Sequence, residues 1–313
     1  MTATPLPGAR LATEIKERVA TATAEWGRSG CHVRLAVVVA TADESTGWYV
    51  RSIARTAAKV GVDCQIVDLG ADASENEIAR RLDELSQDPE VHGIILQTPL
   101  PDEADVARRV ARIVPEKDVD GANPTSLGRL VVGEHAFAPA TARAVVELLD
   151  HHQIPIAGRQ VTVVGRSAVV GKPLLHLLLQ RDATVTICHS RSTPLARYTR
   201  SADIVAVAIG RAGLITAEHI APGAVVIDVG TNVTADGSLV GDVDHESVAE
   251  VAGGLTPVPG GVGAVTTALI LLHTVKAAAL ATVRPSAPDP TASPVAAPGR
   301  RVGVPGRSAR DQP

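Results

Sequence analysis

The sequence predicts an α/β protein of two domains, an N-terminal α/β domain with a mostly parallel sheet and a Rossmann-like domain, with a cleft between them. The 313 residues suffice for two domains with sizeable cores. Runs of Val, Ile and Leu alternate with amphipathic segments in two series, separated by a loop-rich stretch at 118–133. This alternation is typical of βαβ units whose parallel strands are buried on both faces.

The first series contains segments with helical periodicity and segments with strand-like composition in turn. The expected order is helix 11–26, strand 33–40, helix 49–60, strand 64–70, helix 75–88 and strand 91–97. After the loop-rich stretch, a further helix is expected over 140–151.

The second series begins at Val161 and predicts the Rossmann-like domain. We expect a strand, a helix through Leu179, and then strands within 183–192, 203–210 and 224–230. A long apolar helix over 264–280 then returns to pack on the first domain. The resulting assignment is residues 1–137 plus 264–283 for the first domain, 138–263 for the second, and 284–313 for a disordered tail rich in Pro, Ser, Ala and Arg.

Composition excludes several classes of function. The net charge of −4 comes from interspersed signs, so no basic stripe predicts a nucleic-acid partner. No uninterrupted apolar stretch reaches about 18 residues, and the N-terminal residues lack the pattern of a secretory signal, so we expect no membrane span and a cytoplasmic protein. The three scattered cysteines predict buried thiols, with neither a disulfide framework nor a metal site.

Residues 161–173, VTVVGRSAVVGKP, place two glycines between a strand and a helix. Such a turn directs backbone N–H groups at an anion, so Gly165 and Gly171 are candidates for holding a nucleotide phosphate. This spacing is not the G-x-G-x-x-G fingerprint, and a lone glycine turn is often only a βα connection.

The end of the next strand, CHSRS, indicates which nucleotide binds. It contains no Asp or Glu for a ribose 2′-hydroxyl, but it offers hydroxyl and basic groups. We therefore expect NADP, with its 2′-phosphate held by basic and hydroxyl side chains at both strand ends. These side chains are Arg166, Ser167, Ser190 and Arg191.

Four loop segments have unusual composition: LQTPLP at 96–101, PEKDVDG at 115–121, GTN at 230–232 and TPVPGGVG at 256–263. The first and third follow apolar strands, where α/β sheets place their sites. Each also has an ordinary interpretation as a turn or a tight connection.

In order, LQTPLP, PEKDVDG, GRSxxVGxP, CHS, IDVGTN, GDV and TPVPGGVG resemble the methylenetetrahydrofolate dehydrogenase/cyclohydrolase family over roughly residues 5–282. The resemblance implies a homodimer whose protomers bind folate between two domains. It also implies NADP-linked oxidation of 5,10-methylenetetrahydrofolate to the methenyl form, followed by hydrolysis to 10-formyltetrahydrofolate.

The resemblance also implies roles for individual residues. Tyr49 would stack on the folate ring system, Gln97 would tune the family's catalytic lysine, and Asp120 would hydrogen-bond the pterin. The pocket floor would be formed by Pro259, Gly260 and Gly261. The nucleotide side would comprise Gly165, Arg166, Ser167, Ser190, Thr231, Ile209 and Gly210.

One position departs from the family pattern, Tyr-x-x-x-Lys, because Ile53 stands where the lysine is expected. Arg51 and Arg55 lie two residues to either side, on other faces of a helix with about 3.6 residues per turn. Hydride loss needs alignment against the nicotinamide and no protein base. Hydration of the methenyl cation needs general acid–base catalysis, which isoleucine cannot supply. We expect the dehydrogenase activity to persist and the cyclohydrolase activity to be severely reduced.

Two other functions remain open from the sequence. One is a specialised paralogue that oxidises another folate-like C–N substrate. The other is a pseudoenzyme that binds NADP or folate without turnover. The intact glycine loop at 165–171 and the Pro-Gly loop at 257–261 favour an enzyme over a pseudoenzyme.

Overall fold

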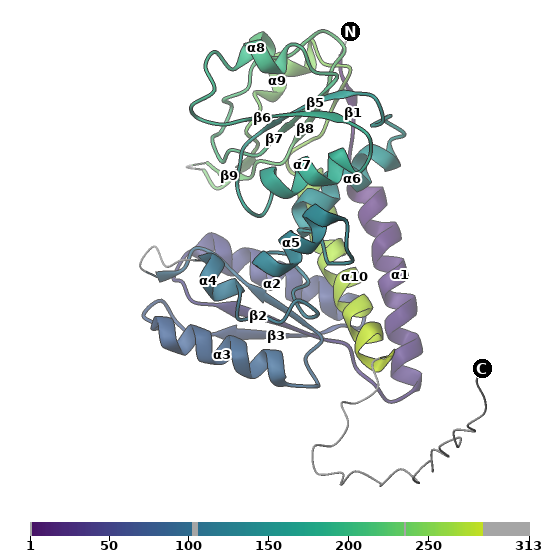
Figure 1. The fold of residues 1–313 in the computed structure, drawn as a ribbon, viewed down its shortest axis with the longest axis vertical. Helices are drawn as coiled ribbons and strands as arrows, with labels where there is room; N and C mark the ends of the chain where they lie inside the picture. Colours follow the sequence, from purple (N-terminus) through teal and green to yellow (C-terminus); the bar gives the residue numbers. More distant parts are fainter. Residues whose placement is uncertain (1, 102–105, 235, 284–313) are drawn as a thin grey trace, which may run out of the picture.

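The computed structural model describes residues 2–101, 106–234 and 236–283. It has two α/β lobes, along whose side run the long helices α1 (Ala9–Arg28) and α10 (Val262–Val283), packed against each other (Figure 1). The predicted α/β class with parallel sheets is confirmed. The predicted tail, 284–313, lies outside the described residues.

The first lobe contains a parallel three-stranded sheet in the order β3-β2-β4. Its strands are β2 (Arg34–Val39), β3 (Asp63–Asp68) and β4 (Gly93–Leu96), connected by α2 (Glu44–Lys59) and α3 (Glu75–Gln87). Helix α2 begins earlier than the sequence predicts, because the Asp43 carboxylate accepts a hydrogen bond from the Thr46 N–H at 2.7 Å and caps it.

The stretch expected to be loop-rich, 118–133, contains helix α5 (Pro124–Val132), so that expectation was too broad. The Asn123 side chain caps this helix, proline occupies its first turn, and Gly133 ends it at φ 79°. These are standard helix start and stop signals, which the unusual composition of the stretch obscured. The short helix α4 (Val106–Val110) precedes it, and α6 (Ala140–His151) follows as predicted.

The second lobe is built on a six-stranded parallel sheet in the order β1-β11-β8-β7-β5-β6. Its strands are β1 (Thr4–Pro5), β5 (Gln160–Val164), β6 (Thr184–Cys188), β7 (Ile204–Val207), β8 (Val225–Asp228) and β11 (Gly254–Leu255). A small hairpin joins β9 (Asn232–Val233) to β10 (Leu239–Val240). The helices of this lobe are α7 (Gly171–Leu179), α8 (Ala196–Thr199) and α9 (His245–Ala249), with a 3₁₀ helix at Ala217–His219.

The chain enters the second lobe first and then crosses to the other. Residues 4–5, which the predicted boundary assigns to the first domain, pair with β11 at the edge of the second sheet. The sequence could not show this, because a two-residue strand carries no periodicity. The N-terminal segment therefore connects helix α1 to both lobes.

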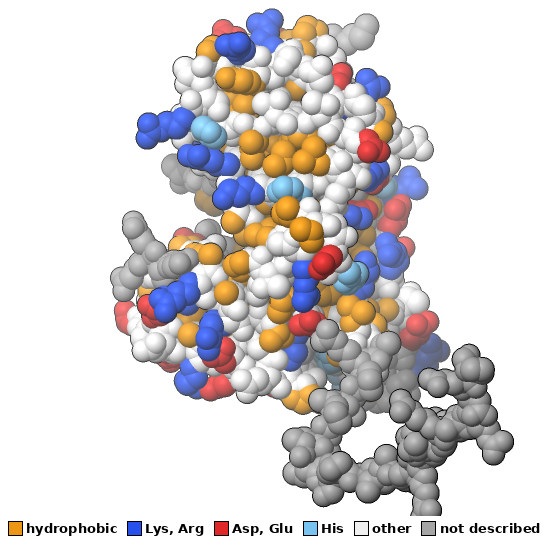
Figure 2. All heavy atoms as spheres, in the orientation of Figure 1, with side chains coloured by type: hydrophobic (Ala, Val, Ile, Leu, Met, Phe, Trp, Pro, Cys, Tyr) orange, Lys and Arg blue, Asp and Glu red, His pale blue; other side chains and the backbone are white. Residues whose placement is uncertain are grey.

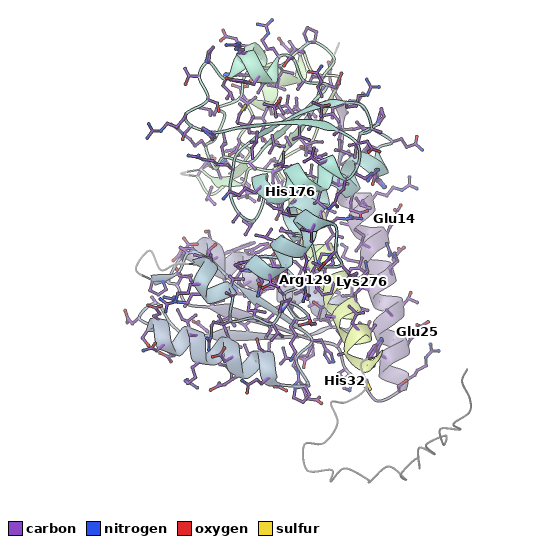
Figure 3. All side chains as sticks on the ribbon, viewed as in Figure 1. Glu14, Glu25, His32, Arg129, His176 and Lys276 are labelled. Atoms are coloured by element: carbon purple, nitrogen blue, oxygen red, sulfur yellow. The ribbon has the colours of Figure 1, made fainter. Side chains whose placement is uncertain are left out.

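Helix α10 has the length and hydropathy of a membrane span over Val262–Thr282, yet 67% of its most apolar window is buried inside the protein. It packs against α1, α6 and β4, which supply the apolar surroundings that such a helix needs. This arrangement is typical of a core helix. Exposed charged side chains, among them Glu14 and Glu25 on α1 and Lys276 on α10, lie on the outer faces of the helix pair (Figure 3).

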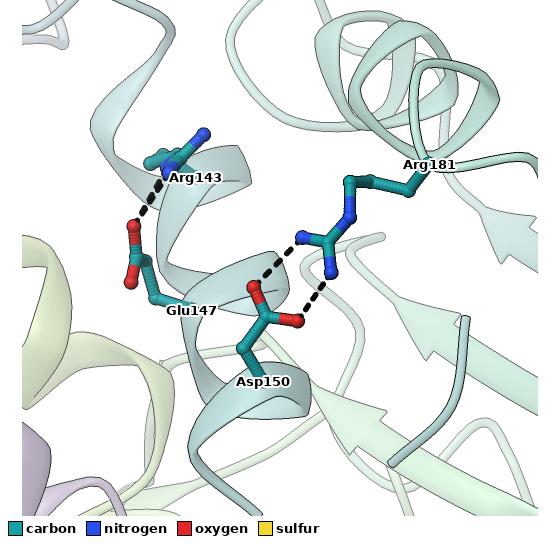
Figure 4. Close-up of polar contacts among 4 residues, drawn as sticks. All are labelled: Arg143, Glu147, Asp150 and Arg181. Carbon is teal, nitrogen blue, oxygen red and sulfur yellow. Dashed lines mark hydrogen bonds and ion pairs between the residues drawn. The ribbon is translucent and has the colours of Figure 1, made fainter. Parts of the chain in front are cut away.

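Helix α6 lies between the helix pair and the second lobe. Asp150 at its end accepts two hydrogen bonds from Arg181, just beyond α7, at 2.6 and 2.7 Å (Figure 4). Within α6, Arg143 pairs with Glu147 at 2.7 Å. The expectation of three buried thiols holds only for Cys188, since Cys64 is half-buried and Cys31 is exposed in the turn after α1.

Candidate functional site

The turn between β5 and α7 has the strand–glycine–helix form expected of a phosphate-binding loop. Gly165 has φ +130°, and a Cβ there would lie 2.1 Å from the Ala208 carbonyl oxygen. Gly171 opens α7, and a Cβ there would lie 2.1 Å from the Gly165 carbonyl oxygen. Both positions therefore require glycine, since any side chain would push the backbone apart.

This turn lies at the point where the order of the second sheet reverses. From β5 the chain goes to β6 on one side and then to β7 on the other. In doubly wound sheets, ligands bind outside the carboxyl ends of the strands at such a point. The crevice here lies between the loops after β5 and β7, which begin side by side because the Ala208 N–H donates to the Val164 carbonyl at 2.8 Å.

The carboxyl ends of β5 and β6 present the basic and hydroxyl groups expected for a 2′-phosphate. The two strands are in register, with Val164 opposite Cys188, and the Gly165 N–H donates to the Cys188 carbonyl at 2.9 Å. The side chains that follow them are exposed: Arg166, Ser167, Ser190 and Arg191. In the described ranges, neither of these arginines forms an ion pair. Figure 2 shows basic side chains along the edge of the second lobe that is nearest the first.

A cavity of about 420 Å³ joins the two lobes and contains several of the predicted site residues. Helix α2 contributes Tyr49, the loop between β8 and β9 contributes Thr231, and the Pro-Gly loop contributes 259–261. A Cβ on Gly260 would meet only the Pro257 ring, at 4.0 Å. The space that a side chain would fill here is therefore open to the cavity. The further lining residues are Lys16, Ser52, Thr56, Asp228, Val229, Gly230, Leu239, Pro257, Val258, Val262, Gly263, Ala264, Thr267 and Ala268.

Tyr49 is the aromatic side chain of this cavity. The residue is 38% exposed, so its ring is accessible, yet its hydroxyl is desolvated by its surroundings. Burial and the nearby charge of Asp120 raise the pKa of Tyr49 to about 12, while a hydrogen bond with Thr267 acts in the opposite direction. The hydroxyl therefore stays protonated near neutral pH, and the ring offers a flat face to a bicyclic ligand.

The two aspartates of PEKDVDG have different roles. Asp118 is buried and accepts hydrogen bonds from the Ala122 and Asn123 N–H groups at 3.0 and 2.9 Å, which shapes the turn before α5. Asp120 is half-buried near Tyr49, and burial, together with the charge of Asp118, raises the pKa of Asp120 to about 7. Within the described ranges, Asp118 therefore holds the turn, whereas the carboxyl of Asp120 accepts no such backbone hydrogen bond.

Among the described residues, the cavity lining does not include three predicted positions: Asp120, Gln97 and Ile53. Gln97 directly follows β4 and is half-buried. The loop that carries it is linked to α2, because the Thr46 hydroxyl donates to the Thr98 carbonyl at 3.2 Å. Ile53 is fully buried and belongs to the apolar core of the first lobe.

The sequence missed the other cavity residues of α2 and α1. Ser52 and Thr56 follow Tyr49 at i+3 and i+7, so one polar stripe of the helix faces the cavity, and Lys16 faces it from α1. The i, i+3, i+7 spacing of polar side chains after Tyr49 was the available signal. Asp228, at the end of β8, was also missed, and burial raises the pKa of its carboxyl to about 6.

Two family models match this chain. The catalytic domain of tetrahydrofolate dehydrogenase/cyclohydrolase matches residues 6–120, and the NAD(P)-binding domain of the same family matches residues 139–282. A curated relative from Paenarthrobacter aurescens, named Bifunctional protein FolD 1, is 65% identical over 89% of this chain and 95% of its own length.

Solved structures agree with this match. The methylenetetrahydrofolate dehydrogenase-cyclohydrolase of Trypanosoma brucei, solved with NADP cofactor and inhibitor, is 34% identical at a TM-score of 0.86 and covers 91% of this chain and 100% of its own. The Campylobacter jejuni enzyme is 35% identical at a TM-score of 0.86, covering 89% of this chain and 99% of its own. This chain therefore belongs to the tetrahydrofolate dehydrogenase/cyclohydrolase family.

Proposed function

We propose that this chain is an NADP-dependent 5,10-methylenetetrahydrofolate dehydrogenase of one-carbon metabolism. The observation that carries the proposal is the cavity between the lobes. It combines Tyr49 from the first lobe with Thr231 and the 259–261 loop from the second. An aromatic platform and an open glycine backbone suit a flat pterin, and Thr231 connects the cavity to the nucleotide side.

On the nucleotide side, the residues present fit NADP. The Gly165 and Gly171 turn places the start of α7 where a pyrophosphate would bind, and Arg166 and Arg191 are exposed without ion-pair partners in the described ranges. With Ser167 and Ser190 they offer charge-assisted hydrogen bonds to a 2′-phosphate. Bound there, NADP would supply a hydride acceptor.

On the substrate side, we assign stacking on the folate ring to Tyr49 and recognition of the pterin N–H edge to the Asp120 carboxylate, which can accept two parallel donors. Gln97, in the loop after β4, is the residue that would tune the family lysine, although Ile53 stands at the position of that lysine. Residues 1–137 plus 264–283 would form the substrate domain and 138–263 the NADP domain, with residues 4–5 added to the second sheet.

Hydride loss from the methylene carbon yields a cation delocalised over the flanking nitrogens, so this step asks the protein for alignment and exclusion of water. The cavity residues can meet that demand without transferring a proton. The cyclohydrolase step also needs proton transfer to and from water. Because Ile53 cannot transfer a proton and is enclosed in the core, we propose that this second activity is severely reduced.

The experiment follows the methenyltetrahydrofolate absorbance with the purified protein and with Ile53→Lys. We expect NADP⁺-dependent formation of the methenyl form by the wild type, and hydrolysis that is roughly 100-fold faster in the lysine variant. Equal hydrolysis by the two proteins would contradict the proposal for this position.

Lys16 supplies the decisive control, because it is the lysine among the residues that line the cavity. If the wild type hydrolyses the methenyl form and Lys16→Met abolishes this, the ammonium of Lys16 has replaced the family lysine. Lys59→Met, at the exposed end of α2, is the matched control and should leave both activities unchanged.

The same assay separates the alternatives when it is combined with calorimetric binding of each ligand. Binding of both ligands without turnover would indicate a pseudoenzyme, and binding of NADP⁺ alone would indicate a paralogue with another C–N substrate. Turnover with methylenetetrahydrofolate supports the dehydrogenase.

We further propose a cytoplasmic homodimer without a nucleic-acid or membrane partner. In the part of the chain that the structure describes, β3 pairs on one side only, with β2, and its Ile66 is 42% exposed. An edge strand with an exposed apolar side chain is a natural surface for pairing with a second copy. Light scattering after size exclusion tests this, since a monomeric mass would contradict it.

A further inference from the structure

We propose that Asp242 is a positioning residue for the dinucleotide: its carboxylate holds the loop after β7 in shape, and Asp228 ties this loop to the substrate cavity. The inference rests on the proposed NADP site. Neither aspartate needs to touch a ligand for this role.

The loop after β7 directs its N–H groups inward, at one carboxylate. Asp242 is fully buried and accepts hydrogen bonds from the N–H groups of Ile209, Gly210 and Arg211 at 2.7, 3.0 and 2.8 Å. A fourth donor, the side-chain amide of Asn232, lies 2.9 Å from the same carboxylate and fixes the segment next to Thr231. These contacts satisfy the hydrogen-bonding capacity of a buried carboxyl group.

The two loops of the crevice therefore have different roles in binding the dinucleotide. The three N–H groups of 209–211 are already paired with Asp242, so they are not available to a phosphate. Anion binding is therefore left to the β5–α7 turn. The loop after β7 contributes the shape of the opposite wall, and that shape depends on Asp242.

Asp228 links the segment around Asp242 to the substrate cavity, because Asp228 itself lines that cavity. It is 3% exposed, and its carboxylate accepts hydrogen bonds from the N–H groups of Gly230, Asp242 and Val243 at 2.9, 3.0 and 3.0 Å. The backbone of Asp242 is thus held by Asp228, while the side chain of Asp242 holds the nucleotide loop.

Two glycines make this packing possible. A Cβ on Gly230 would lie 2.3 Å from the Asp242 carboxyl carbon, and a Cβ on Gly241 would lie 1.7 Å from an Asp228 oxygen. No side chain fits at either position, which gives a physical reason for the glycines of IDVGTN and GDV.

The test is Asp242→Asn, which keeps the shape but places an NH₂ group against backbone or side-chain donors. We expect hydrogen exchange of the 207–212 peptide in the free protein to be about tenfold faster, and the Kd for NADP⁺ measured by calorimetry to rise about tenfold. The KM for methylenetetrahydrofolate should change less than about threefold. A purely structural role would shift both ligands and the melting temperature together.

The matched control is Asp244→Asn, two residues along the same segment. Asp244 caps α9 by accepting a hydrogen bond from the Ser247 N–H at 3.0 Å, and asparagine caps a helix about equally well. Exchange at 207–212 and the NADP⁺ affinity should stay at wild-type values. Wild-type affinity and exchange in Asp242→Asn as well would overturn the proposal.

If Asp242→Asn does not fold, Gly210→Ala tests the same loop with Asp242 intact. Its Cβ would meet nothing within 4 Å, but φ is +65°, so alanine strains the loop without a clash. Faster exchange at 207–212 with unchanged NADP⁺ affinity would overturn the positioning role. If instead the wild type binds no NADP⁺, the proposed function itself fails. The exchange rates at 207–212 would then still measure whether Asp242 holds the loop after β7.

Discussion

At the scale of single residues, the site separates side chains that shape the backbone from side chains that are free to act. Asp118 is occupied by two backbone N–H groups, whereas Asp120, two residues later, has the raised pKa of a carboxyl in a desolvated place. Because the pKa of Asp120 lies near 7, its charge changes within the working range of a folate enzyme.

We predict that the KM for methylenetetrahydrofolate falls as the pH rises through about 7, because the ionised Asp120 accepts pterin N–H donors and the protonated form does not. Asp120→Asn should have a higher KM that is nearly independent of pH between about 6 and 8. The measurement is the pH profile of KM, with kcat as the internal reference. A flat wild-type profile would rule out this role.

The raised pKa of Asp120 also fixes the direction in which this residue makes the stability of the folded protein depend on pH. A raised folded-state pKa means that the folded protein binds the proton more tightly than the unfolded chain does. The contribution of Asp120 is therefore fully present below about pH 4 and is lost as the pH rises through about 7. Removing the carboxyl should stabilise the protein more at alkaline than at acidic pH.

At the scale of elements, the sequence predicted helix α2 but not which of its faces meets the ligand. Tyr49, Ser52 and Thr56 face the cavity, while Ile53, at i+4 from Tyr49, lies in the core. Periodicity identifies the apolar stripe of a helix that packs on the core. The spacing of polar residues, however, is the same whether they face solvent or a cavity, so it does not locate the site. The sequence did not predict Lys16 as a cavity residue for the same reason, since only the packing of α1 brings its side chain to the site.

The glycine turn between β5 and α7 was predictable, because the requirement is local to the backbone. We predict that Gly171→Ala weakens NADP⁺ binding by about tenfold and destabilises the protein by about 2 kcal/mol, since its Cβ would lie 2.1 Å from the Gly165 carbonyl oxygen. Calorimetry and urea unfolding give the two values.

Gly128→Ala is the matched control for that substitution. It lies in helix α5, and its Cβ would meet nothing within 4 Å. Helix propensity alone should make this variant neutral or more stable by about 0.5 to 1 kcal/mol. The interpretation of the turn fails if Gly171→Ala behaves like Gly128→Ala.

Helix α10 carries a buried titratable group that the chemistry does not use. His273 is 6% exposed, one ring nitrogen lies 2.9 Å from the Val119 carbonyl oxygen, and burial lowers the pKa of His273 to about 4. With a folded-state pKa below the unfolded value, the group contributes stability above about pH 6.5 that is lost as the pH falls through about 4.

We predict that the free energy of unfolding of the wild type falls by up to about 2 kcal/mol more than that of His273→Asn between pH 7 and about pH 5. Asparagine can keep the hydrogen bond to Val119 but cannot titrate. Urea unfolding of both proteins at each pH measures the difference, and parallel pH profiles would contradict the prediction.

At the scale of the whole molecule, the two lobes depend on a short N-terminal connection. After β1 pairs with β11, the Gly8 N–H donates to the Gly260 carbonyl at 2.8 Å, so the start of α1 is joined to the Pro-Gly loop of the cavity. This contact spans nearly the full described chain. No local pattern of residues could have predicted it.

We predict that Gly8→Ala damages both stability and substrate binding, although it lies far from the cavity residues in sequence. Its Cβ would lie 2.3 Å from the Gly261 carbonyl oxygen and 2.8 Å from a Val265 methyl group, so the Pro-Gly loop or α1 must move. The expected cost is about 2 kcal/mol in urea unfolding, with a rise of several-fold in the KM for methylenetetrahydrofolate. Gly27→Ala, in the same helix with nothing within 4 Å of its Cβ, should be neutral or slightly stabilising. If both variants have the wild-type KM, the cavity floor does not depend on the N-terminal connection. If only Gly8→Ala raises the KM, the position of α1 against the second lobe helps to determine the shape of the substrate site.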